Sequence, residues 1–116
     1  MSYNKIAGAI YGQFIGDALG TRYEFEPSKN ASTRIHNDKF KTNDNILPIL
    51  GEGPFNLIPG QVTDDTELAM GLMYSILENG KFDPELCVKK YIKWYNSDPF
   101  DIGNTTRNSF TNSSTY

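Results

Sequence analysis

Hydrophobic residues recur at helical spacing near the start of the chain. Along residues 6–19, Ile6, Ile10, Phe14 and Ala18 stand four positions apart, and further apolar residues flank them. Residues four positions apart lie on the same face of an α-helix. This row therefore predicts an amphipathic helix over residues 6–19.

Glycine falls at the same spacing within this predicted helix. The series comprises Gly8, Gly12, Gly16 and Gly20. Each glycine inside a helix costs about 0.5–1 kcal/mol relative to alanine, so we expect the glycine face to let another backbone or a ligand come close. We place Gly20 at or beyond the helix end, where glycine is a favoured cap. Membrane dimer faces share this spacing, but Gln13 and Asp17 favour a tightly packed soluble helix.

A second apolar stripe follows the stretch PGQVTDDTELAM. It comprises Leu68, Ala69, Leu72, Met73, Ile76 and Leu77. The stripe predicts a helix that starts near Asp64 and stops at Asn79–Gly80, because glycine favours the position after a helix. Asp64 and Glu67 stand three residues apart and resemble a capping box, in which side chains accept hydrogen bonds from the free amides of the first turn.

A third helix is predicted to start at Asp83, with Pro84 at its first position, and to end at Asp98–Pro99. Its predicted buried stripe comprises Val88, Tyr91, Ile92 and Tyr95. The remaining segments carry no sustained period. Residues 21–62 are expected to form a long irregular loop with His36 on its surface, and no segment alternates strongly enough to predict a strand. The pattern therefore predicts three helices and an all-α fold.

Composition narrows the class of protein. The 116 residues carry a net charge of −3 and are 38% hydrophobic, which suffices for the core of one domain. An acidic balance without a basic stripe argues against nucleic acid as a partner. Cys87 is the single cysteine, so no internal disulfide forms. The sequence shows neither a signal peptide nor an apolar run of membrane-spanning length, so we expect a soluble cytoplasmic protein that does not engage the membrane.

Three neighbouring residues carry the candidate chemistry. Thr63, Asp64 and Asp65 offer hard oxygen ligands of the kind that magnesium, manganese or calcium prefers. Helix capping explains Asp64 and Glu67 well, Asp65 in part and Thr63 hardly at all. The residues alone therefore favour capping, with a metal site as the alternative. If the residues bind a metal, they indicate a metal-assisted hydrolase acting on a phosphate-bearing substrate.

Three segments occur in a particular order: GAIYGQFIGDALGTRYEFEP, PGQVTDDTELAM and YIKWYNSDPFDIGNTTRNSF. Together they resemble the amino-terminal part of the ADP-ribosylglycohydrolase family, which includes the dinitrogenase reductase-activating glycohydrolases. The resemblance runs from about Ile6 to Phe110. It implies an all-α domain of orthogonally packed helices.

The resemblance also implies a dinuclear Mg²⁺ or Mn²⁺ centre and hydrolysis of the glycosidic bond between ADP-ribose and a protein side chain. The metal ligands of the family fall on Thr63, Asp64 and Asp65. Its glutamate near the metal and substrate falls on Glu24, and an aspartate of arginine-directed members falls on Asp101. The implied partner is therefore an ADP-ribosylated protein, with an arginine linkage favoured, or a small molecule that contains ADP-ribose.

Two family features do not occur in these 116 residues: a late Asp-x-Asp-Thr/Ser metal segment and a central glycine-rich loop. We therefore expect residues 1–116 to form a partial domain that lacks the carboxy-terminal half of the family domain. Two interpretations follow. The chain is a glycohydrolase that is complete only with a missing part or partner, or it is a noncatalytic remnant that serves as a binding or interaction module.

Overall fold

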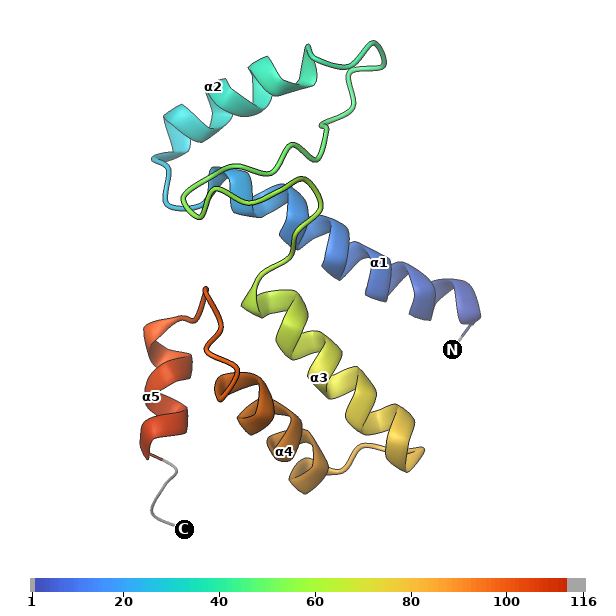
Figure 1. The fold of residues 1–116 in the computed structure, drawn as a ribbon. Coiled ribbons are helices and arrows are strands. Elements are labelled where there is room, and N and C mark those ends of the chain that lie inside the picture. Colours follow the sequence, from blue (N-terminus) through green and yellow to red (C-terminus); the bar gives the residue numbers. More distant parts are fainter. Residues whose placement is uncertain (1, 113–116) are drawn as a thin grey trace. The chain divides into compact units, whose positions relative to one another are not determined.

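The structure is a computed structural model that describes residues 2–112, and it is all-α, as predicted (Figure 1). Its helices are α1 (Tyr3–Gly20), α2 (Ser28–Lys39), α3 (Asp64–Asn79), α4 (Pro84–Tyr95) and α5 (Asn104–Asn112), together with the short 3-10 helix η1 (Thr21–Tyr23). In this part of the chain the β-structure is limited to an isolated antiparallel bridge between Glu52 and Leu57. No helix of the described residues is long and apolar enough to cross a membrane.

The chain divides into two compact units, which we call the first unit (residues 2–62) and the second unit (residues 63–112). The first unit contains α1, η1, α2 and the irregular segment that follows α2. The second unit contains α3, α4 and α5. The two units are described separately below.

Helix α2 lies where we predicted a structureless loop, and that prediction was wrong. The helix is too polar to show an apolar period, and its first residue follows Pro27, whose side chain cannot cap it. Its buried residue is Asp38, which makes tertiary ion pairs. His36 is exposed, but it lies on α2 and its ring packs edge-on against Phe40 at 4.7 Å. Tertiary contacts, not an amphipathic pattern, hold this helix.

Helix α1 matches the predicted first helix, with two corrections. Gly20 is the last residue of α1 and has right-handed helical geometry (φ −71°, ψ −41°), so it does not act as a left-handed cap and the chain continues into η1. A Cβ atom added at Gly8, Gly12 or Gly16 would meet no atom within 4 Å. The predicted close packing on this glycine face is therefore not found among the described residues.

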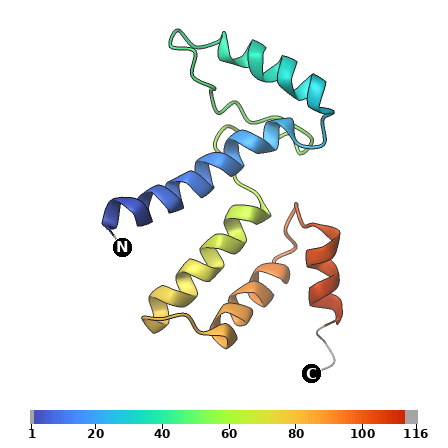
Figure 2. The same cartoon turned by 180° about the vertical axis from the view of Figure 1, so that it is seen from behind.

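In the second unit, α3 and α4 lie side by side (Figure 1 and Figure 2). Gly71 of α3 permits this contact, because a Cβ atom at Gly71 would lie 3.3 Å from the Tyr91 ring of α4. Burial, with the neighbouring Cys87 thiol, raises the pKa of Tyr91 to about 12. Gly80 ends α3 in the left-handed conformation (φ 71°), as predicted.

The predicted start of α4 is confirmed in detail. Asp83 caps the helix, because one carboxylate oxygen accepts hydrogen bonds from the amides of Glu85 at 3.0 Å and Leu86 at 3.2 Å. Pro84 occupies the first helical position, where its missing N–H costs nothing.

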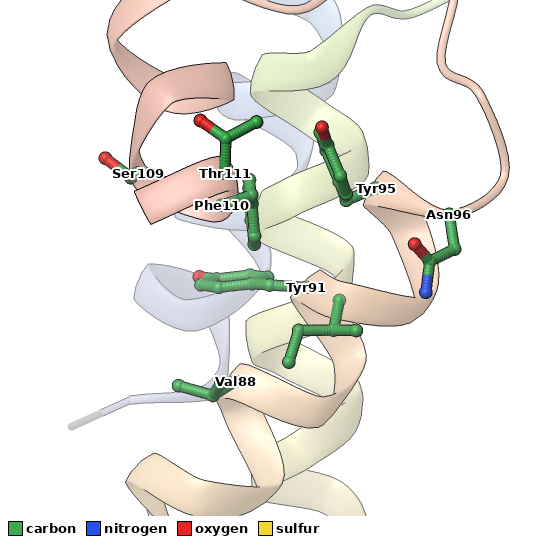
Figure 3. Close-up of a pocket in the computed structure, with 8 residues that line it drawn as sticks. Val88, Tyr91, Tyr95, Asn96, Ser109, Phe110 and Thr111 are labelled. Carbon is green, nitrogen blue, oxygen red and sulfur yellow. The ribbon is translucent and has the colours of Figure 1, made fainter. Parts of the chain in front are cut away.

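The predicted buried stripe of α4 is only partly correct. Val88 is 51% exposed and Ile92 is 44% exposed, whereas Cys87 is buried. The side of α4 that meets α3 is thus rotated by about one residue from the predicted stripe. The other side, with Val88 and Ile92, faces a groove between α4 and α5 (Figure 3).

This α4–α5 groove has a volume of about 660 Å³ and a mostly apolar lining. Its lining residues are Val88, Tyr91, Ile92, Tyr95, Asn96, Ser109, Phe110 and Thr111. The Phe110 ring stacks on the Tyr95 ring at 4.9 Å and 18°, and this stacking joins α5 to α4. We predicted no helix in this region, because nine residues with a single large apolar side chain give too short a pattern to indicate one.

Candidate functional site

The acidic stretch of the sequence forms the start of α3. Thr63 has extended backbone geometry (φ −118°, ψ −163°) and is the N-cap residue, and Asp64 and Asp65 are the first two helical residues. Thr63 is buried, Asp64 is half-buried and Asp65 is exposed. The Thr63 side chain makes no capping hydrogen bond. Capping therefore does not explain the threonine at this position.

The capping-box interpretation of Asp64 and Glu67 is wrong. Asp64 lies one residue inside the helix, so it does not occupy the cap position. The Glu67 carboxylate accepts a hydrogen bond from the indole Nε1–H of Trp94 on α4, at 2.6 Å. Glu67 thus joins two helices, and Asp64 and Asp65 remain as acidic residues that favour the positive end of the helix dipole.

The loop with Asp101 approaches this turn within the second unit. The Gly103 amide donates a long hydrogen bond, 3.4 Å, to Asp64 Oδ2. Gly103 also immediately precedes α5, and its carbonyl accepts a hydrogen bond from the Arg107 amide at 2.9 Å. Two segments that are 39 residues apart in the sequence therefore meet. The half-buried Asp101, two residues before Gly103, belongs to the same loop.

Glu24 lies in the first unit, directly after η1. It is half-buried, and its amide donates a hydrogen bond to the Thr21 carbonyl at 3.4 Å. The next residue, Phe25, has a left-handed backbone (φ 60°), which is uncommon for an aromatic residue. The chain thus turns sharply after Glu24. Glu24 belongs to a different unit from the other predicted site residues.

Arg22, two residues before Glu24, forms ion pairs with the buried Asp38 and the exposed Glu52, and the sequence analysis did not predict them. Arg22 Nε lies 2.7 Å from Asp38 Oδ2, and the side chains of both residues are less than a tenth exposed. This contact holds the pKa of the Asp38 carboxyl far below its usual range and raises that of Arg22. Arg22 also pairs with Glu52 and lowers the pKa of that exposed carboxyl. No sequence signal marks these pairs, because they join Arg22 to residues 16 and 30 positions away, one in a helix without an apolar period and one in a turn.

The donor atoms at the start of α3 can be compared with the needs of a metal ion. Thr63, Asp64 and Asp65 offer one hydroxyl and two carboxylates, and this donor chemistry fits a hard divalent cation. In residues 2–112, no three His, Cys, Asp or Glu side chains gather as a metal-binding group. The three residues thus fit part of a site, and water or substrate oxygens can complete a magnesium shell.

Comparison with known proteins then decides the family. The sequence pattern of the ADP-ribosylglycohydrolase family matches residues 2–116. The chain belongs to the ADP-ribosylglycohydrolase family. The predicted resemblance is confirmed, and so is the all-α fold class that it implied.

Individual relatives support this assignment. A protein of Acanthamoeba polyphaga mimivirus named "Putative ADP-ribosyl glycohydrolase" is 44% identical over 95% of this chain and 32% of its own length. The ADP-ribosylarginine hydrolase Tri1 of Serratia proteamaculans is 42% identical over 93% of this chain and 28% of its own length. The ADP-ribosyl-[dinitrogen reductase] glycohydrolase of Rhodospirillum rubrum is 32% identical over 90% of this chain and 33% of its own length. The chain thus spans about a third of the length of these curated glycohydrolases.

Proposed function

We propose that this chain carries part of the active site of a metal-dependent hydrolase that removes ADP-ribose from arginine side chains. The observation behind the proposal is the hydrogen bond from Gly103 to Asp64, which brings the Asp101 loop to the acidic turn at the start of α3. In this proposal, the turn that would bind the metal and the loop whose acid would face the guanidinium are therefore neighbours. Relatives named ADP-ribosylarginine hydrolase, from two bacterial species, favour the arginine linkage.

In this proposal each residue has a distinct task. Thr63, Asp64 and Asp65 would hold Mg²⁺ or Mn²⁺, which when bound supplies Lewis-acid polarisation of a substrate oxygen. The negative charge of Asp101 would orient the arginine guanidinium at the scissile bond. Glu24 would orient the attacking water or the ribose. Water adds to the anomeric carbon of the ribose, the bond from that carbon to the guanidino nitrogen breaks, and the departing arginine takes up a proton.

The test is release of ADP-ribose from ADP-ribosyl-arginine, in Mg²⁺ or Mn²⁺, by the 116-residue chain complemented with the carboxy-terminal half of a related family enzyme. The expected result is metal-dependent cleavage that a chelator abolishes. Asp101→Asn should lower kcat by about tenfold or more and change substrate binding much less, because a neutral amide keeps the shape but loses the charge that orients the guanidinium. Unchanged turnover in Asp101→Asn would remove this residue from the mechanism.

A noncatalytic interaction module is the second possibility, and the exposed α4–α5 groove favours it. Val88 and Ile92 present apolar surface there, of the kind that partners cover. The same assay separates the two functions. Binding of ADP-ribose or of an ADP-ribosylated peptide, with no cleavage at any metal concentration, would favour the interaction module.

A further inference from the structure

A buried ion pair lies at the centre of the first unit. The Arg22 guanidinium donates two hydrogen bonds to Asp38, from Nε to Oδ2 at 2.7 Å and from Nη2 to Oδ1 at 3.3 Å. The Tyr23 hydroxyl adds a third, to Asp38 Oδ2 at 3.0 Å. Arg22 is 5% exposed and Asp38 is 2% exposed. A two-point contact of this kind fixes orientation as well as distance, so it anchors η1 to the end of α2.

A turn closes over the same arginine. Arg22 Nη1 donates to the Gly51 carbonyl at 3.1 Å and to the Glu52 carboxylate. Gly51, Glu52 and Gly53 all have left-handed backbones. A Cβ atom at Gly53 would lie 2.6 Å from the Thr21 carbonyl oxygen and 2.9 Å from Arg22 Cα. The turn thus lies directly against the backbone of η1, and only glycine permits this approach.

These contacts converge on the backbone of Glu24. The Thr21 carbonyl that touches the turn is also the acceptor of the Glu24 amide. On the other side, Glu26 pairs with Arg34, whose Nη1 also lies 3.5 Å from the Arg22 carbonyl. Between these two anchors the chain makes its left-handed bend at Phe25. A strained bend persists only where its surroundings hold it.

We propose that Arg22, Asp38 and the Gly51–Gly53 turn form a clamp that positions Glu24. The members of the clamp are positioning residues, since each acts through the backbone of η1. The catalytic consequence rests on the proposed function, in which Glu24 orients water or the ribose. The mechanical part of the proposal, that the clamp holds the backbone at Glu24 in place, does not depend on that function.

Two glycine variants test the mechanical part in the 116-residue chain. Gly53→Ala drives a methyl group into the Thr21 carbonyl. Gly60→Ala is the matched control, because Gly60 is also left-handed (φ 86°) but an added Cβ there meets no atom within 4 Å. Amide exchange, measured by NMR, should become about tenfold faster or more at Glu24 and Glu26 in Gly53→Ala. In Gly60→Ala it should change by less than about twofold. Equal exchange in both variants overturns the clamp.

A less disruptive pair of variants tests the clamp if Gly53→Ala unfolds the first unit. Glu52→Gln keeps the side-chain shape but removes one charge that pairs with Arg22. Asp44→Asn removes a charge from an exposed residue of the same unit and serves as the control. Glu52→Gln should accelerate exchange at Glu24 by about threefold or more, and Asp44→Asn should leave it unchanged. No difference between these two variants also overturns the clamp.

A double-mutant cycle tests the catalytic part. In the ADP-ribosyl-arginine assay, Gly53→Ala should lower kcat by about tenfold and change KM by less than about threefold. In a Glu24→Gln background the same substitution should cost less than about twofold, because the group that it misplaces is already disabled. Equal losses in both backgrounds would show general damage and refute positioning. If the wild-type chain complemented in the same way cleaves nothing, the proposed function fails and amide exchange alone decides the clamp.

Discussion

The indole Nε1–H of Trp94 donates a hydrogen bond to Glu67 Oε2 at 2.6 Å. This contact joins the first turns of α3 to the last turn of α4 across 27 residues of sequence. It also removes Glu67 from any capping role at the start of α3. A contact between two helices thus lies within one turn of Asp64 and Asp65.

Replacing Glu67 should reveal how much this contact stabilises the second unit. Glu67→Ala should lower the free energy of unfolding by about 1–2 kcal/mol, since the indole N–H then lacks its partner. Glu67→Gln keeps an oxygen acceptor and should cost clearly less. Urea unfolding followed by the fluorescence of Trp94, the single tryptophan, measures both values. Equal midpoints for the alanine and glutamine variants would contradict the structural role of this hydrogen bond.

Substitution of the two aspartates separates metal binding from helix stability. Asp64→Asn and Asp65→Asn should each weaken Mg²⁺ or Mn²⁺ binding by tenfold or more, about 1.4 kcal/mol. A hard cation gains much less from a neutral amide than from a carboxylate. The far-UV helix signal should hardly change. Calorimetric titration of the wild-type chain, with binding expected near millimolar concentration, provides the reference.

The control for this titration is Asp83→Asn. Asp83 caps α4 through two backbone amides, and asparagine caps about as well as aspartate. Metal affinity should therefore stay at the wild-type value in this variant. If all three asparagine variants bind the metal equally, Asp64 and Asp65 are acidic first-turn residues and not ligands.

Stability of the first unit should depend on pH through Asp38. Its folded pKa is depressed by hydrogen bonds from Arg22 despite burial, so its contribution is fully present above the unfolded pKa of about 3.9. The contribution is lost as pH falls towards the folded pKa. Asp38→Asn should cost about 3 kcal/mol at pH 7, the lower end of the range for breaking a buried pair, because Glu52 still faces Arg22.

Thermal unfolding at pH 7 and at pH 3 tests this direction of the pH dependence. The loss of stability in Asp38→Asn relative to wild type should be large at pH 7 and smaller at pH 3. At pH 3 the unfolded state holds a proton on Asp38 and the folded state does not. Asp44→Asn, a change at an exposed carboxylate, should follow the wild type at both values. A constant difference across the pH range would show that the ion pair does not control acid stability.

The α4–α5 groove should make the isolated chain prone to self-association. Exposed Val88 and Ile92 lie beside the aromatic lining, and a surface of this kind is rarely left uncovered. Ile92→Lys should lower the associated fraction in sedimentation experiments and reduce binding of an apolar dye. Lys93→Gln, which changes a neighbouring exposed residue, is the control. A wild-type chain that remains monomeric at high concentration would contradict this prediction.

The sequence predicted those elements that depend only on residues close together in the chain. The apolar period of α3, the αL glycine at Gly80 and the Asp83–Pro84 start of α4 all act within one or two turns, so a pattern of neighbouring residues was enough to predict them. The three ordered motifs likewise predicted the family, which the match over residues 2–116 confirms. The metal, Glu24 and Asp101 assignments rest on that resemblance and stay predictions.

Tertiary structure decided what depends on residues far apart in the chain. Helix α2 has no apolar period, and it is held by the ion pair of Asp38 with Arg22, a contact that composition cannot show. The face of α4 that becomes buried depends on where α3 lies, so Cys87 is covered while Val88 remains open. Glu67 matched a capping pattern but accepts a hydrogen bond from Trp94, which is 27 residues away in the sequence. Side-chain burial and pairing depend on how the chain folds. A sequence pattern predicts only the part of burial that repeats along a helix.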